Sequence, residues 1–275
     1  MSAPLAGGEA TVLAALQTWP SAIAVDATSI YWASDGTLKK LPLAGGTPVR
    51  LVEEQVDAKA LAVDGEHVYF ANVGSDELGS VMRVPLAGGT PVLLASEPGS
   101  GPTAIALDAD NVYWANGSSR ENHRVLKVAR GGGTPVVLVT GANSVFGMAA
   151  DATHVYFTTF ETLAGGAGQS TVRKVPIAGG DATVLASGDP QPLALAVDGA
   201  NIYWANASTS YTLGSGSGTD GKVLSVPKAG GVTITLGGSE ADPGSITSNG
   251  TRVCWARYGD GTVACLGACA NSRCR

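Results

Sequence analysis

A repeat with six copies runs through this sequence. Five copies carry an aspartate at the same position, and the sixth carries an asparagine, Asn249, there. Five carboxylates gathered by a repeat have the chemistry of a metal site. Aspartate and asparagine also accept hydrogen bonds from backbone N–H groups two residues further on, and each of these residues stands at a tight turn between two apolar stretches. We therefore interpret them as turn caps. The five aspartates are Asp26, Asp64, Asp108, Asp151 and Asp198.

The four cysteines, Cys254, Cys265, Cys269 and Cys274, all lie near one end of the chain. Such clustering favours local disulfides, which need an oxidising compartment. A zinc site is the alternative, but there is no CxxC pair and no histidine nearby. If residues 259–260 form a two-residue hairpin turn, Cys254 faces Cys265 at disulfide distance, and Cys269 is free to pair with Cys274. A bulge in that hairpin would let Cys265 bond Cys269 or Cys274 instead.

The elements that position these residues come from a repeat. An apolar stretch ending in Asp, an aromatic pair, a second apolar stretch and an Ala-Gly-Gly turn recur six times, at intervals of roughly 40–50 residues, a period that suits four-stranded blades. Each copy has four segments with the composition of short strands, and no stretch has a helical period. The sequence predicts an all-β fold, a six-bladed β-propeller. The aromatic landmarks are Trp32, Phe70, Trp114, Phe157, Trp204 and Trp255.

The sixth copy supplies only three strand segments, residues 245–248, 253–257 and 262–266, before the cysteine-containing tail 268–275. Residues 10–14 follow an Ala-Gly-Gly turn, as the outer strand does in every other copy. We expect residues 10–14 to be the outer strand of the last blade, because this leaves no blade edge unpaired. The whole chain, 1–275, is then a single domain.

Two sets of loops alternate along the repeat, and one set varies greatly in length. Long, divergent loops on one side of a rigid scaffold are where binding sites are usually built. These loops, with the segments that lead into each blade, carry aromatic, amide and charged side chains suited to a glycan, a peptide or a small polar ligand. The candidate ligand-binding residues are Trp19, Asp57, His123, Phe146, Asn206, Tyr211, Asp242 and Tyr258.

The repeat resembles a known pattern. Its Ala-Val-Asp stretch, its Ile-Tyr-Trp-Ala-Asn stretch and its Gly-Gly turn are similar to the YWTD repeats of LDL-receptor-type propellers, and equally to bacterial six-bladed propellers of the TolB-like and NHL-like groups. The resemblance covers essentially the whole chain and implies the fold rather than a function. The final Asp of the YWTD motif is absent from all six copies, so the blade-to-blade hydrogen bonds it makes are not expected here.

Two classes of function remain open. The sequence favours a non-catalytic binding module, because no Gly-x-Ser-x-Gly or HExxH motif is present. The alternative is a metal-dependent hydrolase, lactonase or lyase at the mouth of the central channel. Asp57, Asp242 and Asn143 could then supply oxygen ligands to Ca²⁺, as in regucalcin-like propellers, and His123 could act as a general base, as in streptogramin-lyase-like propellers.

Composition narrows the partners and the compartment. The net charge of −6 disfavours nucleic acid, and no apolar stretch approaches the length of a membrane span. The cysteines favour an extracytoplasmic protein, secreted, periplasmic or surface-anchored. Because the chain begins within a repeat, we expect that a leader is absent from it.

Overall fold

The computed structural model contains only strands, turns and irregular segments in the part of the chain that it describes. None of those residues is helical, so this part of the chain contains no helix that could cross a membrane. The described residues are 13–15, 17–53, 58–73, 78–98, 101–117, 123–162, 168–188, 191–208, 218–260 and 262–267.

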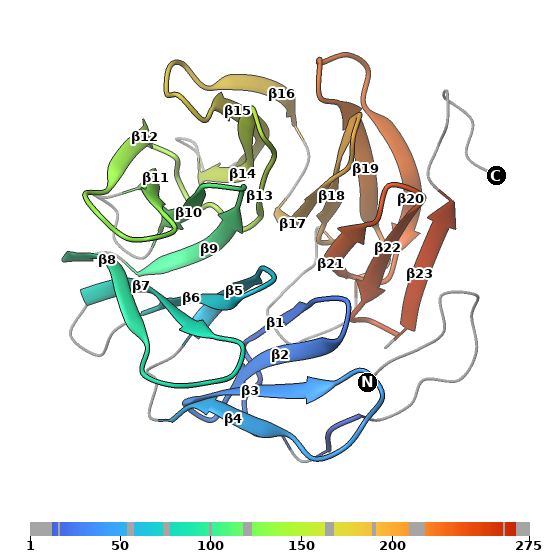
Figure 1. Cartoon of the computed structure of the whole chain (residues 1–275). Helices are drawn as coiled ribbons and strands as arrows, with labels where there is room; N and C mark the ends of the chain where they lie inside the picture. The colour runs from blue at the N-terminus through green and yellow to red at the C-terminus, as the bar shows by residue number, and fades with distance from the viewer. Residues whose placement is uncertain are drawn as a thin grey trace. The chain divides into compact units, whose positions relative to one another are not determined.

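Within the described residues, the strands form six antiparallel sheets, each built by strands that follow one another in the chain (Figure 1). The first five sheets have four strands each, and the sixth has three. The all-β, six-bladed fold class predicted from the sequence is confirmed.

The sheets are named blades one to six in chain order. Blades one and two contain β1 (Ala22–Val25), β2 (Ser29–Ser34), β3 (Thr37–Pro42), β4 (Val49–Val52), β5 (Ala58–Val63), β6 (His67–Asn72), β7 (Leu78–Pro85) and β8 (Val92–Pro98). Blades three and four contain β9 (Pro102–Leu107), β10 (Asn111–Asn116), β11 (Arg124–Ala129), β12 (Val136–Thr140), β13 (Met148–Ala150), β14 (His154–Thr162), β15 (Gly168–Pro176) and β16 (Thr183–Ser187). Blades five and six contain β17 (Pro192–Val197), β18 (Asn201–Asn206), β19 (Gly221–Pro227), β20 (Ile234–Glu240), β21 (Pro243–Ser248), β22 (Arg252–Arg257) and β23 (Thr262–Gly267).

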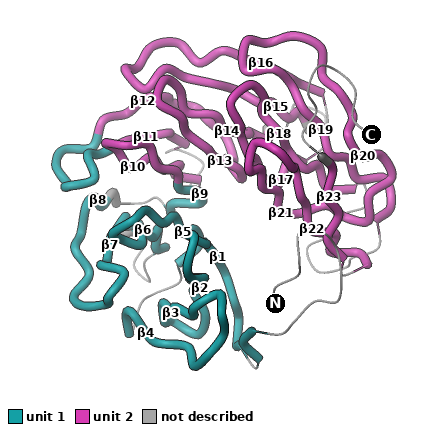
Figure 2. Tube along the Cα trace, turned by 45° about the vertical axis from the view of Figure 1, so that its right-hand side comes forward, with its two compact units in different colours: residues 1–105, 128–135 teal, residues 106–127, 136–275 magenta. Residues whose placement is uncertain are grey.

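The chain divides into two compact units, which Figure 2 colours separately. Unit 1 comprises residues 1–105 and 128–135, and unit 2 comprises residues 106–127 and 136–275.

Successive blades within a unit share apolar cores. In unit 1, Tyr31 and Leu38 of blade one pack in one cluster with Val68 and Phe70 of blade two. In unit 2, a cluster joins blades four and five, and another, which includes Trp255, joins blades five and six. The aromatic landmarks predicted from the sequence are therefore core residues, each 5% exposed or less. Burying such large rings supplies much of the free energy of folding.

The recurring aspartates cap turns, as expected, and also bind a tyrosine. Oδ1 of Asp26 accepts hydrogen bonds from the backbone N–H groups of Thr28 and Ser29, at 2.7 and 2.8 Å. Its other oxygen, Oδ2, accepts one from the Tyr31 hydroxyl at 2.7 Å. The same arrangement recurs in blades two to five. Each carboxylate therefore ties the turn to the buried tyrosine of the following strand, a link that the sequence analysis did not predict.

Cations from the next blade strengthen two of these links. Nη1 of Arg130, in blade three, lies 2.6 Å from Oδ2 of Asp64 in blade two, within unit 1. Nζ of Lys228, in blade five, lies 2.8 Å from Oδ2 of Asp151 in blade four, within unit 2. The Arg130 and Lys228 side chains are largely buried, and both cations lie over the ring of the linked tyrosine. These charge-assisted contacts join neighbouring blades more strongly than exposed ion pairs would.

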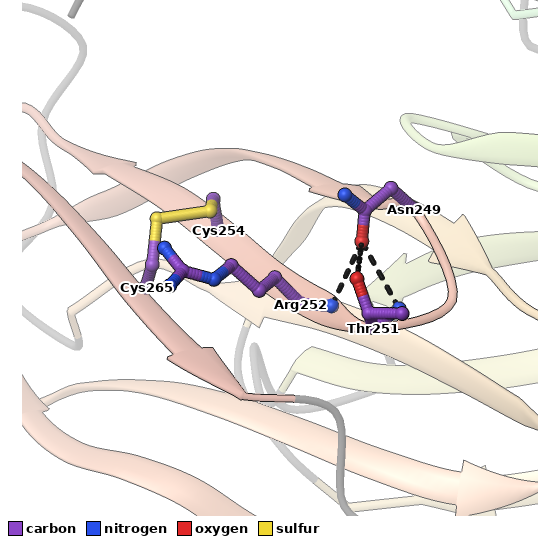
Figure 3. The surroundings of a disulfide bond; sticks show 5 residues. All are labelled: Asn249, Thr251, Arg252, Cys254 and Cys265. Atoms are coloured by element: carbon purple, nitrogen blue, oxygen red, sulfur yellow. Dashed lines mark hydrogen bonds between the residues drawn. A yellow bond between two sulfur atoms is a disulfide. The ribbon is translucent and has the colours of Figure 1, made fainter. Parts of the chain in front are cut away.

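Blade six replaces this arrangement with a disulfide. Asn249 keeps the turn, because its Oδ1 accepts hydrogen bonds from the N–H groups of Thr251 and Arg252 at 3.0 and 2.8 Å (Figure 3). The tyrosine position is Cys254, which is bonded to Cys265 across the β22–β23 hairpin, with 4.1 Å between the Cα atoms. The strand register pairs these two residues directly, as the hairpin argument predicted. Cys269 and Cys274 lie outside the described residues.

The outer strand expected in blade six falls mostly outside the described residues. Residues 10–12 are not described, and residues 13–14 form a bend. The described part of blade six ends at β23. Closure of the ring by residues 10–14 therefore stays a prediction.

Replacing Gly147 by alanine should lower the free energy of unfolding by about 1–3 kcal/mol, because the new methyl group meets backbone atoms. A Cβ at Gly147 would lie 2.6 Å from the nitrogen of Leu195 and 2.8 Å from the carbonyl carbon of Ala194, both in blade five. Gly199→Ala is the matched control, since a Cβ there meets nothing within 4 Å. Thermal unfolding followed by circular dichroism measures both, and equal melting temperatures for the two variants would contradict the close approach.

Candidate functional site

A cavity of about 290 Å³ opens in unit 1 between blades one and two. Its inner wall is buried and mostly apolar. Its rim is exposed and carries an indole ring, a carboxylate and hydroxyl groups, a combination typical of small-molecule sites. The cavity is lined by Trp19, Ser21, Ala33, Ser34, Asp35, Gly36, Thr37, Leu38, Ala58 and Phe70.

A tight hairpin turn forms one side of the cavity. Ser34 pairs with Thr37, so only Asp35 and Gly36 connect β2 to β3. Both residues have positive φ, 52° and 67°, which is the conformation that an Asp-Gly pair favours in two-residue hairpins. The turn places the Asp35 side chain at the exposed rim.

Trp19 also lines the cavity and is 85% exposed. An exposed tryptophan beside a cavity offers a flat apolar face to a ligand. Its backbone has a φ of 48°, a left-handed conformation that is uncommon for a residue with a side chain. Pro20 follows it and leads into β1.

Gln17 anchors the segment that carries Trp19. Its Oε1 accepts hydrogen bonds from Nε1 of Trp32 and from Nζ of Lys39, both at 3.0 Å. Blade six has the same arrangement, in which Oε2 of Glu240 accepts from Nε1 of Trp255 at 2.9 Å and from Nε of Arg257 at 2.5 Å. The segment that leads into each of these two blades is therefore hydrogen-bonded to the tryptophan of the same blade.

The left-handed position of Trp19 recurs in other blades. Ser144, Gln191 and Asp242 also have positive φ, and each stands just before a first strand in unit 2. The backbone around two of these residues is hydrogen-bonded alike, since Ala207 N–H donates to the carbonyl of Gln191 and Tyr258 N–H to that of Asp242. Non-glycine residues in this region cost conformational energy, and such positions gather at functional sites.

The structure brings some predicted residues together within unit 2. His123 and Phe146 belong to neighbouring loops of blade three, because Nδ1 of His123 accepts the N–H of Ser144 at 3.2 Å. Phe146 is 46% exposed and Tyr258 is 55% exposed. Tyr258 N–H donates to the Asp242 carbonyl at 3.0 Å, so these two residues are adjacent at the start of blade six.

Asn206 and Asp242 are less accessible than the sequence analysis expected. They are 1% and 0% exposed, so neither lies on an open binding surface. Among the predicted residues that the structure describes, only Trp19 lines the cavity of unit 1. Asp57 and Tyr211 lie outside the described residues.

The sequence analysis missed Asp35, Ser21 and Gln17. It looked for a site in the long loops, whereas this cavity lies beside a two-residue turn. The Asp-Gly pair at residues 35–36 was the available signal, because its geometry directs a carboxylate outward. Gln17 had a second signal: it precedes Trp32 by the same interval at which Glu240 precedes Trp255.

No family model matches the chain, and no curated protein matches it significantly. Solved structures do. A chain of the nidogen/laminin complex is 21% identical with a TM-score of 0.66, covering 87% of this chain and 89% of that one. A putative TolB from Agrobacterium tumefaciens is 15% identical with a TM-score of 0.61, covering 92% and 91%. At these identities the likeness shows the fold alone, and that fold is the six-bladed β-propeller.

Proposed function

We propose that this propeller is a non-catalytic binding module and that it takes a carbohydrate in the cavity beside Trp19. One observation carries the proposal: an 85% exposed indole stands at the rim of a 290 Å³ cavity whose floor is apolar and buried. That volume lies at the small end of ligand sites, about 300–1,000 Å³, and suits one or two sugar rings better than a large ligand.

The polar groups of the cavity favour a ligand rich in hydrogen-bond donors. Asp35 carries a carboxylate, which only accepts when ionised. Ser21 donates its hydroxyl to the carbonyl of Ala58 at 2.6 Å, and Thr37 donates its own to the carbonyl of Ser34 at 2.8 Å. Both hydroxyl oxygens therefore meet a ligand as acceptors. Sugar hydroxyls supply such donors, and the C–H face of a sugar ring can pack on Trp19.

A peptide or protein partner is the second candidate. It is supported by the nidogen/laminin comparison, whose propeller was solved in a protein complex. The same acceptor groups would suit a ligand ammonium group, and an indole is a common anchor of protein interfaces. An extracytoplasmic location is part of the proposal under either candidate, because the Cys254–Cys265 disulfide persists in oxidising compartments.

The proposal is tested by binding to a glycan array, followed by calorimetry with the best ligand. We expect Trp19→Ala to weaken binding at least tenfold and Trp19→Phe to retain part of the affinity, because an aromatic face remains. Neither variant should change the melting temperature much, since the side chain is exposed. Asp35→Asn should weaken binding while keeping the turn, because asparagine also tolerates positive φ.

Phe146→Ala is the matched control, as it removes an exposed aromatic ring that does not line the cavity. Equal affinity of the Trp19→Ala variant and the wild-type protein would refute the site. Binding of peptides but no glycans on parallel arrays, still lost in Trp19→Ala, would favour the second candidate.

A further inference from the structure

Three buried polar side chains gather in unit 2 near the end of blade five that leads into blade six. Asp242 is 0% exposed, Asn206 1% and Ser208 2%. Among the residues that the structure describes, Oδ1 of Asp242, Oγ of Ser208 and both polar atoms of the Asn206 amide have no hydrogen-bond partner. Buried polar atoms are nearly always paired, so a group of them without protein partners calls for a bound water or ion.

Gly218 shows that two of these groups face one point. A Cβ built on Gly218 would lie 2.0 Å from Cβ and 2.2 Å from Oγ of Ser208, and 2.7 Å from Oδ1 of Asp242. The backbone N–H of Gly218 donates to the other carboxylate oxygen, Oδ2, at 3.0 Å. The backbone of Gly218 therefore packs directly against both side chains, and it leaves the hydroxyl and carboxylate oxygens close to one another beside it.

Asn206 belongs to the same end of the blade. It pairs with Lys222 across the β18–β19 ladder, and the neighbouring Gly221 pairs with Glu240 in β20. A Cβ built on Gly221 would lie 2.2 Å from Cδ of Pro243, the residue after Asp242. One carboxylate, one hydroxyl and one amide are thus supplied by the ends of β18 and β20.

The charge of Asp242 is not balanced by the described residues. Glu240, two residues earlier, is matched by Arg257 and by the indole N–H of Trp255. No lysine, arginine or histidine among the described residues forms an ion pair with Asp242, whose carboxylate has one backbone N–H as its donor. A buried carboxylate in this condition is costly unless a cation accompanies it.

We propose that Asp242 Oδ1, Ser208 Oγ and Asn206 Oδ1 bind one hard divalent cation, Ca²⁺ in preference to Mg²⁺. The donors are all oxygen, which Ca²⁺ prefers, and waters or backbone carbonyls complete its larger and more flexible coordination shell. The described residues contain no group of three or more histidine, cysteine, aspartate or glutamate side chains, so a softer metal has no comparable site there. With one carboxylate, the affinity belongs to the weak range of extracellular modules, about 10⁻⁴–10⁻³ M.

The site is tested on the full chain, stripped with EDTA and dialysed. We expect 10 mM CaCl₂ to raise the melting temperature by several degrees and MgCl₂ to raise it less. Tb³⁺, used as a Ca²⁺ substitute, should give luminescence sensitised by Trp204 and Trp255, and added Ca²⁺ should displace it. Asp242→Asn should abolish both signals while keeping the left-handed backbone, because asparagine tolerates it. Asp181→Asn, which removes an exposed carboxylate, is the matched control and should keep both.

The order of the two melting temperatures, with and without Ca²⁺, distinguishes a metal ligand from a structural residue. In EDTA the Asp242→Asn variant should melt at or above the wild-type temperature, because it lacks the unbalanced charge, and in 10 mM Ca²⁺ it should melt below. The proposal is overturned if the wild-type protein shows neither a Ca²⁺-dependent shift nor Tb³⁺ luminescence, in which case a water pairs these buried atoms. It is also overturned if Asp242→Asn responds to Ca²⁺ as the wild-type protein does.

Discussion

A protein with serine at both Cys254 and Cys265 unfolds at a melting temperature roughly 5–10 °C below that of the wild-type protein. The disulfide closes a loop with a sequence separation of 11 residues. Removing such a link from the unfolded chain restores conformational entropy worth about 3 kcal/mol. Blade six has no Asp–Tyr pair to compensate, because Asn249 and Cys254 occupy those positions. Differential scanning calorimetry measures the change.

A reducing agent supplies the internal control, since it should lower the melting temperature of the wild-type protein and leave that of the double-serine variant unchanged. A rescue variant combines Asn249→Asp, Cys254→Tyr and Cys265→Lys. It rebuilds the arrangement of blade one, where Tyr31 bonds Asp26 and faces Lys40 across the strands. It should recover part of the lost stability without a disulfide. If oxidised and reduced wild-type protein melt at the same temperature, the disulfide does not stabilise blade six.

Acid should unfold this protein steeply between about pH 4 and pH 2, because the turn aspartates must take up protons there. Burial raises the pKa of Asp26, but hydrogen bonds from Tyr31, Thr28 and Ser29 outweigh it and lower that pKa to about 2. In Asp64, Asp108 and Asp151 burial likewise raises the pKa, and hydrogen bonds outweigh it, with the Arg130 charge helping at Asp64, so each pKa is below its ordinary value. A carboxylate whose pKa falls on folding stabilises the protein above its unfolded pKa of about 3.9 and loses that contribution as the pH drops through its folded value.

With four such groups, we expect the melting temperature to fall by roughly 10 °C or more from pH 5 to pH 2, measured by circular dichroism. Asp151→Asn is the informative variant, because asparagine makes the same turn at Asn249. It should melt lower than the wild-type protein at pH 7, having lost its pair with Lys228, and should show a shallower fall in acid. An unchanged slope in this variant and in Asp26→Asn would mean that other groups govern the acid transition.

The sequence was sufficient to place nearly every strand, because turn residues regularly separate stretches that have the composition of strands. β23 was expected at residues 262–266 and lies at Thr262–Gly267, and the β22–β23 register was expected to pair Cys254 with Cys265 and does. The tyrosine bonds were missed because they join a side chain to a turn five residues earlier, an interval that matches neither strand nor helix periodicity. The constant Asp-x₄-Tyr spacing in five copies was the signal for them.

The binding residues were harder to predict, because exposure and burial at loop positions depend on how neighbouring loops pack. Trp19 and Asp242 occupy the same place in their blades, with φ of 48° and 46°, yet one is 85% exposed and the other fully buried. Nothing in the local sequence separates them. Asp242 is buried partly because Gly218 allows close approach, and that contact is remote in the chain.

The repeated left-handed position has a consequence for how new specificities arise. The same backbone conformation carries an indole at Trp19, a hydroxyl at Ser144, an amide at Gln191 and a carboxylate at Asp242. The conformation is thus set by the surrounding main chain, as the matching hydrogen bonds at Gln191 and Asp242 indicate, and is insensitive to the side chain. At the exposed positions, the side chain can therefore change without disturbing the fold. A display library randomised at the exposed left-handed positions would sample new ligands on an unaltered scaffold. Natural duplication of blades, followed by single codon changes at these positions, would do the same.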